Sequence, residues 1–294
     1  MRVLVTGAKG QLGHDVVHLF ENAGHLVLPC DRDSLDITDD AMCLERVQQF
    51  KPDAIIHCAA YTAVDQAETD VDAAYAVNAV GTRNMVLAAE RVKAKFCYIS
   101  TDYVFDGTAV SPYQEYDNTN PQSVYGKSKR AGETLVQSLS SAFFIVRTSW
   151  VFGLHGHNFV KTMLKLGQEK PLLNVVNDQK GSPTYTVDLA AFLLELIQTE
   201  KYGIYHASNT GECTWFEFAQ AIFEEASSVF GQGYSVRVEP CTTEDFPRPA
   251  PRPRNSVMDH LSIRTNGFQD IRPWREALKA FLIDLKANQE INSG

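Results

Sequence analysis

Short apolar runs alternate along the chain with longer segments of helical periodicity. The runs lie at 3–5, 26–28, 54–58, 96–99, 143–146 and 204–207, and helical patterns fill most intervals between them, as at 70–91 and 125–139. Strands that alternate with helices in this way predict an α/β fold whose doubly wound parallel sheet is covered on both faces.

The alternation weakens after about residue 150, where Asn, Gly and Pro become frequent. We expect a first domain over 1–150. Residues 151–294 should form mainly a smaller α/β subdomain, with some segments returning to the first sheet. The proline-rich segment 246–254 cannot be a helix or a central strand, because proline lacks the donor N–H. It should be an extended surface loop.

Composition narrows the class of protein. The 294 residues are 44% hydrophobic, which is enough for a full core. The net charge of -9 argues against DNA or RNA as the main partner, since phosphates are neutralised by a basic face. The six cysteines show no C-x-x-C spacing and should be reduced. Without a signal-peptide pattern or an apolar run that could cross a bilayer, the sequence predicts a soluble cytoplasmic protein.

A glycine-rich turn follows the first apolar run. Gly7, Gly10 and Gly13 stand between this expected strand and an expected helix. Such glycines let the backbone turn tightly and approach a pyrophosphate, which then lies at the positive end of the helix. The spacing G-x-x-G-x-x-G differs from the commonest dinucleotide fingerprint, so a plain turn is the alternative. After the second run, Asp31 suits a ribose and Arg32 suits a 2′-phosphate, so NAD and NADP are not separated.

Tyr125 and Lys129 stand four residues apart in an expected helix and share one face. A neighbouring ammonium stabilises a phenolate and lowers the pKa of the phenol, which makes tyrosine a usable general acid. A solvated helix face is the other interpretation. Thr101 ends the fourth run, where ligands collect in parallel sheets, and is a candidate catalytic hydroxyl; it could also only satisfy nearby backbone.

Two further features lie near the expected ligand edge. Ala60, Tyr61 and Thr62 follow the third run, where the backbone could pass close to a ligand or simply make a tight turn. Asn78 stands in an otherwise apolar helical pattern, either as a buried amide that braces backbone or as an exposed residue.

Together these residues resemble the extended short-chain dehydrogenase/reductases over about the first half of the chain. The runs 100–105, 147–150, 177–184 and 252–256 are similar to the branch of that family that reduces dTDP-4-dehydrorhamnose, and they extend the likeness across nearly the whole chain. The resemblance implies a Rossmann-like NAD(P)-binding domain and a substrate-binding subdomain.

The resemblance also implies an activity. A reduced nicotinamide, NADPH or alternatively NADH, would deliver hydride to the C4 keto group of dTDP-4-dehydro-6-deoxy-L-mannose, giving dTDP-L-rhamnose as the final step of its synthesis. Tyr125 would protonate the alkoxide, Lys129 would lower the pKa of the phenol and bind the nicotinamide ribose, and Thr101 would orient the carbonyl.

Further site residues are carried over from the family. Asp102 and Trp150 match its sugar contacts. Arg252 is our candidate for the substrate diphosphate, because a guanidinium fork suits phosphate oxygens, although an exposed loop arginine is an equal alternative. The implied cofactor positions are Gly7, Gly10, Gln11, Leu12, Asp31, Arg32, Asp36, Ile37, Ala60, Tyr61, Thr62, Tyr125 and Lys129.

Some members of the family bind Mg²⁺ with glutamates at a subunit interface. This chain keeps an acid there as Asp15 but has Val187 and Arg275 at the other positions. Two missing carboxylates leave too few oxygen ligands, so we expect no structural metal, and a homodimer stays an open alternative.

Four other functions on this fold compete with this activity. Another nucleotide-sugar 4-ketoreductase would carry out the same reaction on a different keto sugar. A 4,6-dehydratase would carry a Glu where this chain has Tyr103. A 4-epimerase would retain tightly bound NAD. A regulatory subunit would bind NADP without reducing a sugar, but the catalytic set is intact here.

Overall fold

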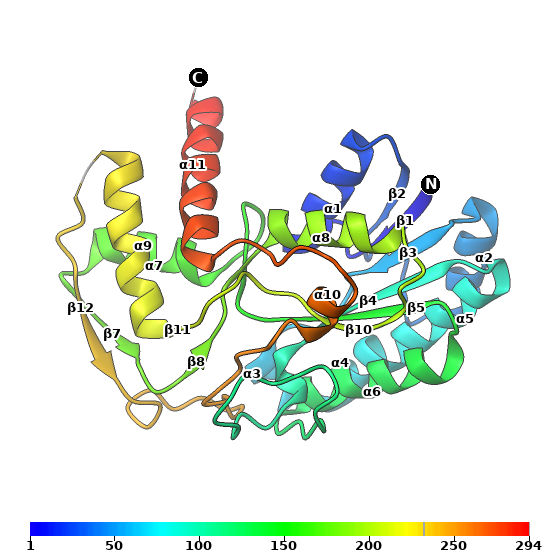
Figure 1. Cartoon of the computed structure of the whole chain (residues 1–294), viewed down its shortest axis with the longest axis horizontal. Helices are drawn as coiled ribbons and strands as arrows, with labels where there is room; N and C mark the ends of the chain where they lie inside the picture. Colours follow the sequence, from blue (N-terminus) through cyan, green and yellow to red (C-terminus); the bar gives the residue numbers. More distant parts are fainter. Residues whose placement is uncertain (232, 294) are drawn as a thin grey trace.

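A six-stranded parallel sheet forms the centre of the computed structural model, which describes residues 1–231 and 233–293 (Figure 1). Its strand order is β10-β5-β4-β3-β1-β2, and every neighbouring pair is parallel. The strands are β1 (Arg2–Thr6), β2 (Leu26–Cys30), β3 (Ala54–His57), β4 (Lys95–Thr101), β5 (Phe143–Thr148) and β10 (Gly203–His206). The predicted α/β fold with a doubly wound sheet is confirmed.

Helices cover both faces of this sheet (Figure 1). One face carries α1 (Gln11–Asn22) and α8 (Thr186–Ile197), whose side chains share a core with β1 and β5. The other carries α2 (Asp40–Phe50), α5 (Thr82–Val92) and α6 (Val124–Leu139). Because both faces are buried, a ligand is most readily received at the carboxyl edge of the strands.

The segment 70–91, predicted as one helix, has three parts. After the short helix α3 (Val64–Ala67), α4 (Val71–Tyr75) continues into a π-helical turn, η1 (Ala76–Gly81), and then into α5. The π turn carries the fully buried Asn78. The helix widens where this amide faces inward and hydrogen-bonds to Tyr61, a combination typical of functional sites.

The rest of the chain builds a smaller unit with its own apolar core (left side of Figure 1). It contains a parallel pair, β7–β12, and two-residue pairs β6–β9 and β11–β8. Segment 246–254 contains no helix or strand. The elements of this unit are β6 (Val151–Phe152), α7 (Phe159–Glu169), β7 (Leu172–Val176), β8 (Lys180–Gly181), β9 (Thr184–Tyr185), β11 (Cys213–Thr214), α9 (Trp215–Phe230), β12 (Arg237–Cys241) and α11 (Trp274–Ser293). Two short helices lie with the large sheet: η2 (Asp102–Val104) follows β4, and α10 (Leu261–Thr265) packs against β10.

Chain segments on both sides of residue 150 contribute to the large sheet, because β10 pairs with β5. The boundary at residue 150 stays a prediction. Cys30, Cys43, Cys58, Cys97, Cys213 and Cys241 are all free thiols. Within 1–231 and 233–293, no helix combines the length and the apolar character needed to span a bilayer.

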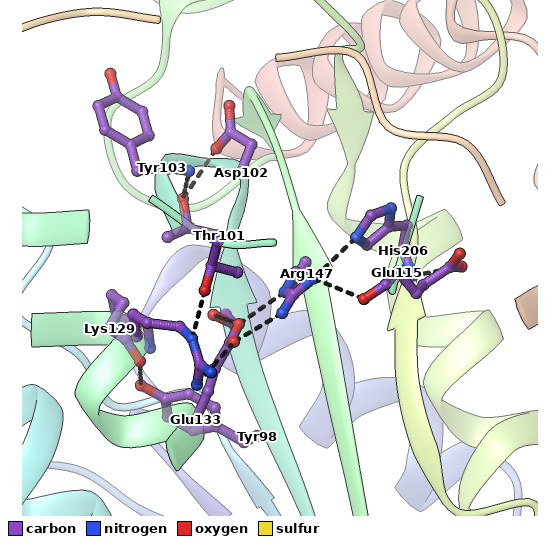
Figure 2. Close-up of polar contacts among 12 residues, drawn as sticks. Tyr98, Thr101, Asp102, Tyr103, Glu115, Lys129, Glu133, Arg147 and His206 are labelled. Carbon is purple, nitrogen blue, oxygen red and sulfur yellow. Dashed lines mark hydrogen bonds and ion pairs between the residues drawn. The ribbon is translucent and has the colours of Figure 1, made fainter. Parts of the chain in front are cut away.

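A buried ion pair joins the catalytic candidate helix α6 to the sheet (Figure 2). Arg147 on β5 binds both carboxylate oxygens of Glu133, each at 2.9 Å, and both side chains are at most 2% exposed. A third guanidinium nitrogen donates to the Glu115 carbonyl at 3.2 Å and lies 3.3 Å from His206 Nε2. Arg147 therefore ties α6, β5, β10 and the loop at Glu115 together.

We expect Arg147→Met to lower the free energy of unfolding by about 3–5 kcal/mol, because it leaves the Glu133 carboxylate buried without its cation. The double variant Arg147→Met/Glu133→Leu should recover part of that loss. Urea denaturation measures both.

The matched control is Arg237→Met, which breaks a solvent-exposed pair with Glu239 and should change stability by less than about 0.5 kcal/mol. Equal effects of the two arginine substitutions would contradict a special role for the buried pair.

Candidate active site

The glycine turn lies where β1 passes into α1, beside the end of β3. Gly7 has a φ of +64°, and a side chain there would come within 2.8 Å of the Ala59 nitrogen. At Gly13 a Cβ would lie 2.1 Å from the Gly7 carbonyl oxygen. No side chain caps the N-terminus of α1 at Gly10. The turn is thus a close-packed cradle with helix N–H groups free to bind an anion, which fits a dinucleotide pyrophosphate.

Next to this turn, Lys9 and Ser34 surround the Asp31 carboxylate just after β2. Its Oδ1 accepts hydrogen bonds from the Ser34 N–H at 3.0 Å and from the Ser34 hydroxyl at 2.9 Å. Its Oδ2 is paired with the Lys9 ammonium. The Lys9 contact first, and then Ser34, hold the pKa of Asp31 well below its usual value. This corner therefore offers a cation and a hydroxyl. The charge of the neighbouring Arg32 acts on Asp36, where it adds to the hydrogen bonds that lower the pKa of that carboxyl.

The loops after β2 and β3 supply the other expected cofactor positions. Asp36 Oδ1 accepts from the Thr38 N–H at 2.9 Å, and the Ile37 side chain is buried. The buried amide of Asn78 accepts from the Tyr61 N–H at 2.8 Å and donates to the Tyr61 carbonyl at 3.1 Å. This fixes the backbone of the segment 60–62. Asn78 is therefore the brace rather than the exposed residue.

Thr101 lies at the carboxyl end of β4, and its hydroxyl is held by the turn that follows (Figure 2). It donates to Asp102 Oδ1 at 2.9 Å and accepts from the Tyr103 N–H at 3.2 Å. Asp102 is 2% exposed, and its Oδ2 is buried without a hydrogen-bond partner in the described part of the chain. Burial raises the pKa of Asp102 to about 6, and the nearby hydroxyls of Thr101 and then Ser256 oppose that rise. The Oδ2 atom keeps capacity for a further hydrogen bond beside Thr101.

The Tyr125–Lys129 pair lies in the first turns of α6, as the spacing predicted. Ser123 caps this helix by accepting from the Gly126 N–H at 3.1 Å. A side chain at Gly126 would lie 2.2 Å from the Tyr103 carbonyl oxygen, so only glycine lets the helix approach the turn after β4 this closely. This approach brings the phenol of Tyr125 near enough to Thr101 for the Thr101 side chain to lower its pKa, against the larger effect of burial.

Lys129 is 2% exposed and faces the interior. Its ammonium donates to the Ile99 carbonyl at 2.7 Å and lies 4.1 Å from the centre of the Tyr98 ring. Burial lowers the pKa of Lys129 to about 7, while Glu133, one turn further along α6, opposes that shift. Burial likewise raises the pKa of Tyr125 to about 12, against the Thr101 hydrogen bond. The phenol therefore keeps its proton at neutral pH.

The expected substrate contacts lie further along the same edge. The Trp150 ring stacks on Trp215 with centroids 3.6 Å apart, and Gly181 leaves the room that the indole fills. Arg252 pairs with Asp65 at 2.9 Å and lines a cavity of about 630 Å³ together with Lys180 and Arg254. Three cationic side chains, together with the carboxylates of Asp106 and Asp178, thus border a cavity large enough for part of a nucleotide sugar.

Sequence reasoning missed Lys9, Asp65 and Glu133. Glu133 had a usable signal, since it stands four residues after Lys129 on the predicted helix. Lys9 lies within the glycine turn, but nothing in the sequence places its ammonium at Asp31. Asp65 meets Arg252 from 187 residues away and had no local signal.

Comparisons with known proteins agree with this geometry. The family model described as the RmlD substrate binding domain matches residues 1–287. A dTDP-4-dehydrorhamnose reductase from Aggregatibacter actinomycetemcomitans is 44% identical, over 95% of this chain and 97% of its own. The spore coat polysaccharide biosynthesis protein SpsK of Bacillus subtilis is 43% identical, over 96% of each chain.

Solved structures give the same relationship. A dTDP-4-dehydrorhamnose reductase from Bacillus anthracis, determined in complex with NADP, superposes with a TM-score of 0.93 at 47% identity, covering 96% of this chain and 99% of its own. An ortholog from Clostridium acetobutylicum reaches 0.94 at 44% identity, covering 97% and 100%. With the glycine cradle, the Thr101 turn and the Tyr125–Lys129 helix at one edge of its sheet, the chain belongs to the RmlD substrate-binding-domain family of the extended short-chain dehydrogenase/reductases.

Proposed function

We propose that the protein is an NADPH-dependent dTDP-4-dehydrorhamnose reductase, which reduces the C4 keto group of dTDP-4-dehydro-6-deoxy-L-mannose to give dTDP-L-rhamnose. The observation that carries this proposal is the placement of Tyr125 and the buried Lys129 in the first turns of α6, packed against the end of β4, where Lys129 bonds to Ile99 and Thr101 ends the strand. The glycine cradle lies at the same edge of the sheet. Relatives of that name cover nearly the whole chain.

The bound nicotinamide supplies the hydride. Tyr125 gives its proton to the oxygen that becomes the C4 hydroxyl, and Thr101 donates a hydrogen bond that orients the same oxygen. Lys129 supplies a positive charge close to the phenol and stabilises the phenolate left after the transfer. Burial, and after it the nearby Asp102, raise the pKa of Tyr125, so the structure does not show the lowering by Lys129 that the sequence argument expected. We propose that lowering for the ligand-bound enzyme.

We assign the preference for NADPH to Lys9 and Arg32, with Ser34 beside them. A 2′-phosphate at this corner would meet two cations, and it would take over the ammonium that now pairs with Asp31. The pyrophosphate would lie on the N–H groups of Gln11 and Leu12 in the first turn of α1, while the Gly10 N–H donates to the Gly7 carbonyl and closes the turn.

For the substrate, we propose that Asp102 and Trp150 contact the sugar and that Arg252 contacts the diphosphate. The unpartnered Asp102 Oδ2 suits a sugar hydroxyl, which would satisfy a buried acceptor. Asp65 now neutralises Arg252 and holds it at the cavity wall. We further propose that the protein is cytoplasmic. A homodimer is a second proposal, which a measurement of molecular mass in solution would test.

Other enzymes share the fold. UDP-glucose 4-epimerase from Thermus thermophilus superposes with a TM-score of 0.80 at 21% identity, which shows the fold alone. An epimerase would purify with tightly held NAD, whereas a reductase needs a fresh reduced cofactor in each turnover. Measuring bound NAD in the purified protein separates these two functions.

Tyr125→Phe should lower kcat by about 10²–10⁴-fold, because it removes the proton donor. NADPH oxidation with a dTDP-4-keto-6-deoxy sugar measures this, and an NADPH fluorescence titration should show unchanged binding. Tyr116→Phe, at a ring that is 77% exposed, is the control and should stay fully active. Retained turnover in Tyr125→Phe would show that another group gives the proton.

Arg32→Ala should lower kcat/KM for NADPH by roughly 10–150-fold, the loss expected for one hydrogen-bonded charge contact of about 1.5–3 kcal/mol. The value for NADH should change less than about threefold. Steady-state kinetics with both cofactors measures the ratio, with Arg91→Ala on the exposed side of α5 as the control. An equal loss for the two cofactors would remove Arg32 from 2′-phosphate recognition.

The depressed pKa of Lys129 predicts a pH effect on stability. Between pH 7 and 10.5 the unfolded chain keeps the lysine proton and the folded chain loses it, so this group makes the folded state more stable as pH rises. The free energy of unfolding of the wild type minus that of Lys129→Met should therefore increase from pH 7 to 9, by at most about 1.4 kcal/mol per pH unit.

Urea denaturation across that pH range measures the difference. Lys127→Met, at an exposed position of α6, is the control and should run parallel to the wild type. Parallel curves for Lys129→Met as well would mean that the buried lysine keeps its ordinary pKa.

A further inference from the structure

Two imidazoles and one carboxylate meet where α1 faces the loop 153–158, away from the proposed reacting groups. His14 and Asp15 are neighbours on α1, and His155 approaches them from the loop. One donor atom from each side chain lies within 4.8 Å of the other two. Ligands about 2.0–2.2 Å from a tetrahedral zinc lie roughly 3.4 Å apart, so small side-chain rotations bring these donors to one ion.

We propose that His14, Asp15 and His155 form a binding site for a divalent transition-metal ion such as Zn²⁺ or Co²⁺. Two imidazole nitrogens with one carboxylate oxygen suit these ions, whereas Mg²⁺ prefers oxygen ligands throughout. The sequence predicts no structural metal when only carboxylate ligands are counted. That count leaves out the imidazoles of His14 and His155, which the fold brings to Asp15.

The state of each ligand supports the proposal. Asp15 Oδ2 is buried and, among the described residues, has no hydrogen-bond partner, which leaves an acceptor that a cation would satisfy. The rings of His14 and His155 stack with centroids 3.4 Å apart, so the two imidazoles already lie side by side, and His14 is exposed. Imidazole nitrogens are ordinary ligands of these ions.

One neighbouring charge opposes a cation here. The Lys161 ammonium lies near His155. It donates hydrogen bonds to the carbonyls of Leu154 and Gly156, and these dipoles offset part of its positive charge. Asp15 supplies a compensating negative charge directly to the ion.

The location gives the ion a structural effect. The loop 153–158 is already joined to the start of α1, because Asn158 donates to Gln11 Oε1 at 2.8 Å and Gln11 donates to the Val151 carbonyl at 3.4 Å. A metal on His14 and His155 would add a second link between the loop and the helix that forms the glycine cradle. Metal binding should therefore stabilise the folded protein as a whole.

The test is calorimetric titration of the untagged full chain with Co²⁺, together with its thermal midpoint with and without Co²⁺. We expect one equivalent of Co²⁺ to bind and to raise the midpoint, and Mg²⁺ to do neither. Separate His155→Ala and Asp15→Asn variants should each weaken binding at least tenfold and lose the midpoint shift. His157→Ala, an exposed histidine of the same loop, should behave as the wild type.

Two results would overturn the proposal. One is no saturable binding of Co²⁺ up to about 1 mM, which corresponds to only about 4 kcal/mol of binding free energy. The other is binding that survives His155→Ala, because it would place the ion on another group, such as the His14–His18 pair one helical turn apart or the half-buried thiols of Cys58 and Cys241. Neither outcome bears on sugar reduction, since the titration needs no substrate.

Discussion

The bidentate pair between Glu133 and Arg147 is the constraint on which the arrangement of the site depends. It fixes α6 against β5 from inside the protein, and the same guanidinium reaches Glu115 and His206 on segments that come from either side of the helix in sequence. An ion pair removed from water holds its geometry only when nearly all its hydrogen-bonding atoms are used, as they are here. Tyr125 and Lys129 lie on this helix, so the ion pair also fixes their positions.

The same carboxylate also sets the electrostatics of the reacting groups. Glu133 accepts from Ser100 at 2.7 Å, next to Thr101, and stabilises the charge of Lys129 one turn away. Burial without a partner would push the lysine further toward its neutral form. Glu133 therefore has two roles. Its bonds to Arg147 hold α6 against the sheet, and its negative charge stabilises the ammonium of Lys129.

Much of the fold could be predicted from the sequence because its signals are local. The apolar runs, the glycine turn and the Tyr125–Lys129 spacing each lie within a single strand, turn or helix. The π turn at Asn78 could not be predicted, since it depends on a hydrogen bond to Tyr61 across two elements. Lys9 with Asp31, Asp65 with Arg252 and His14 with His155 depend in the same way on the packed fold, because no period in the sequence relates their positions.

These long-range contacts are also where the two parts of the molecule meet. Two hydrogen bonds join helices beside the large sheet to the later part of the chain, at the two ends of the proposed ligand site. One links Gln11 on α1 to Asn158, and the other links Asp65 on α3 to Arg252. A guanidinium already paired with a carboxylate binds a diphosphate only by exchanging or sharing that partner, so part of the gain in binding is offset by the lost pair. With Arg252 in its proposed role at the diphosphate, Asp65 would hold it in place and would also moderate its affinity, which would favour release of a product that carries the same diphosphate.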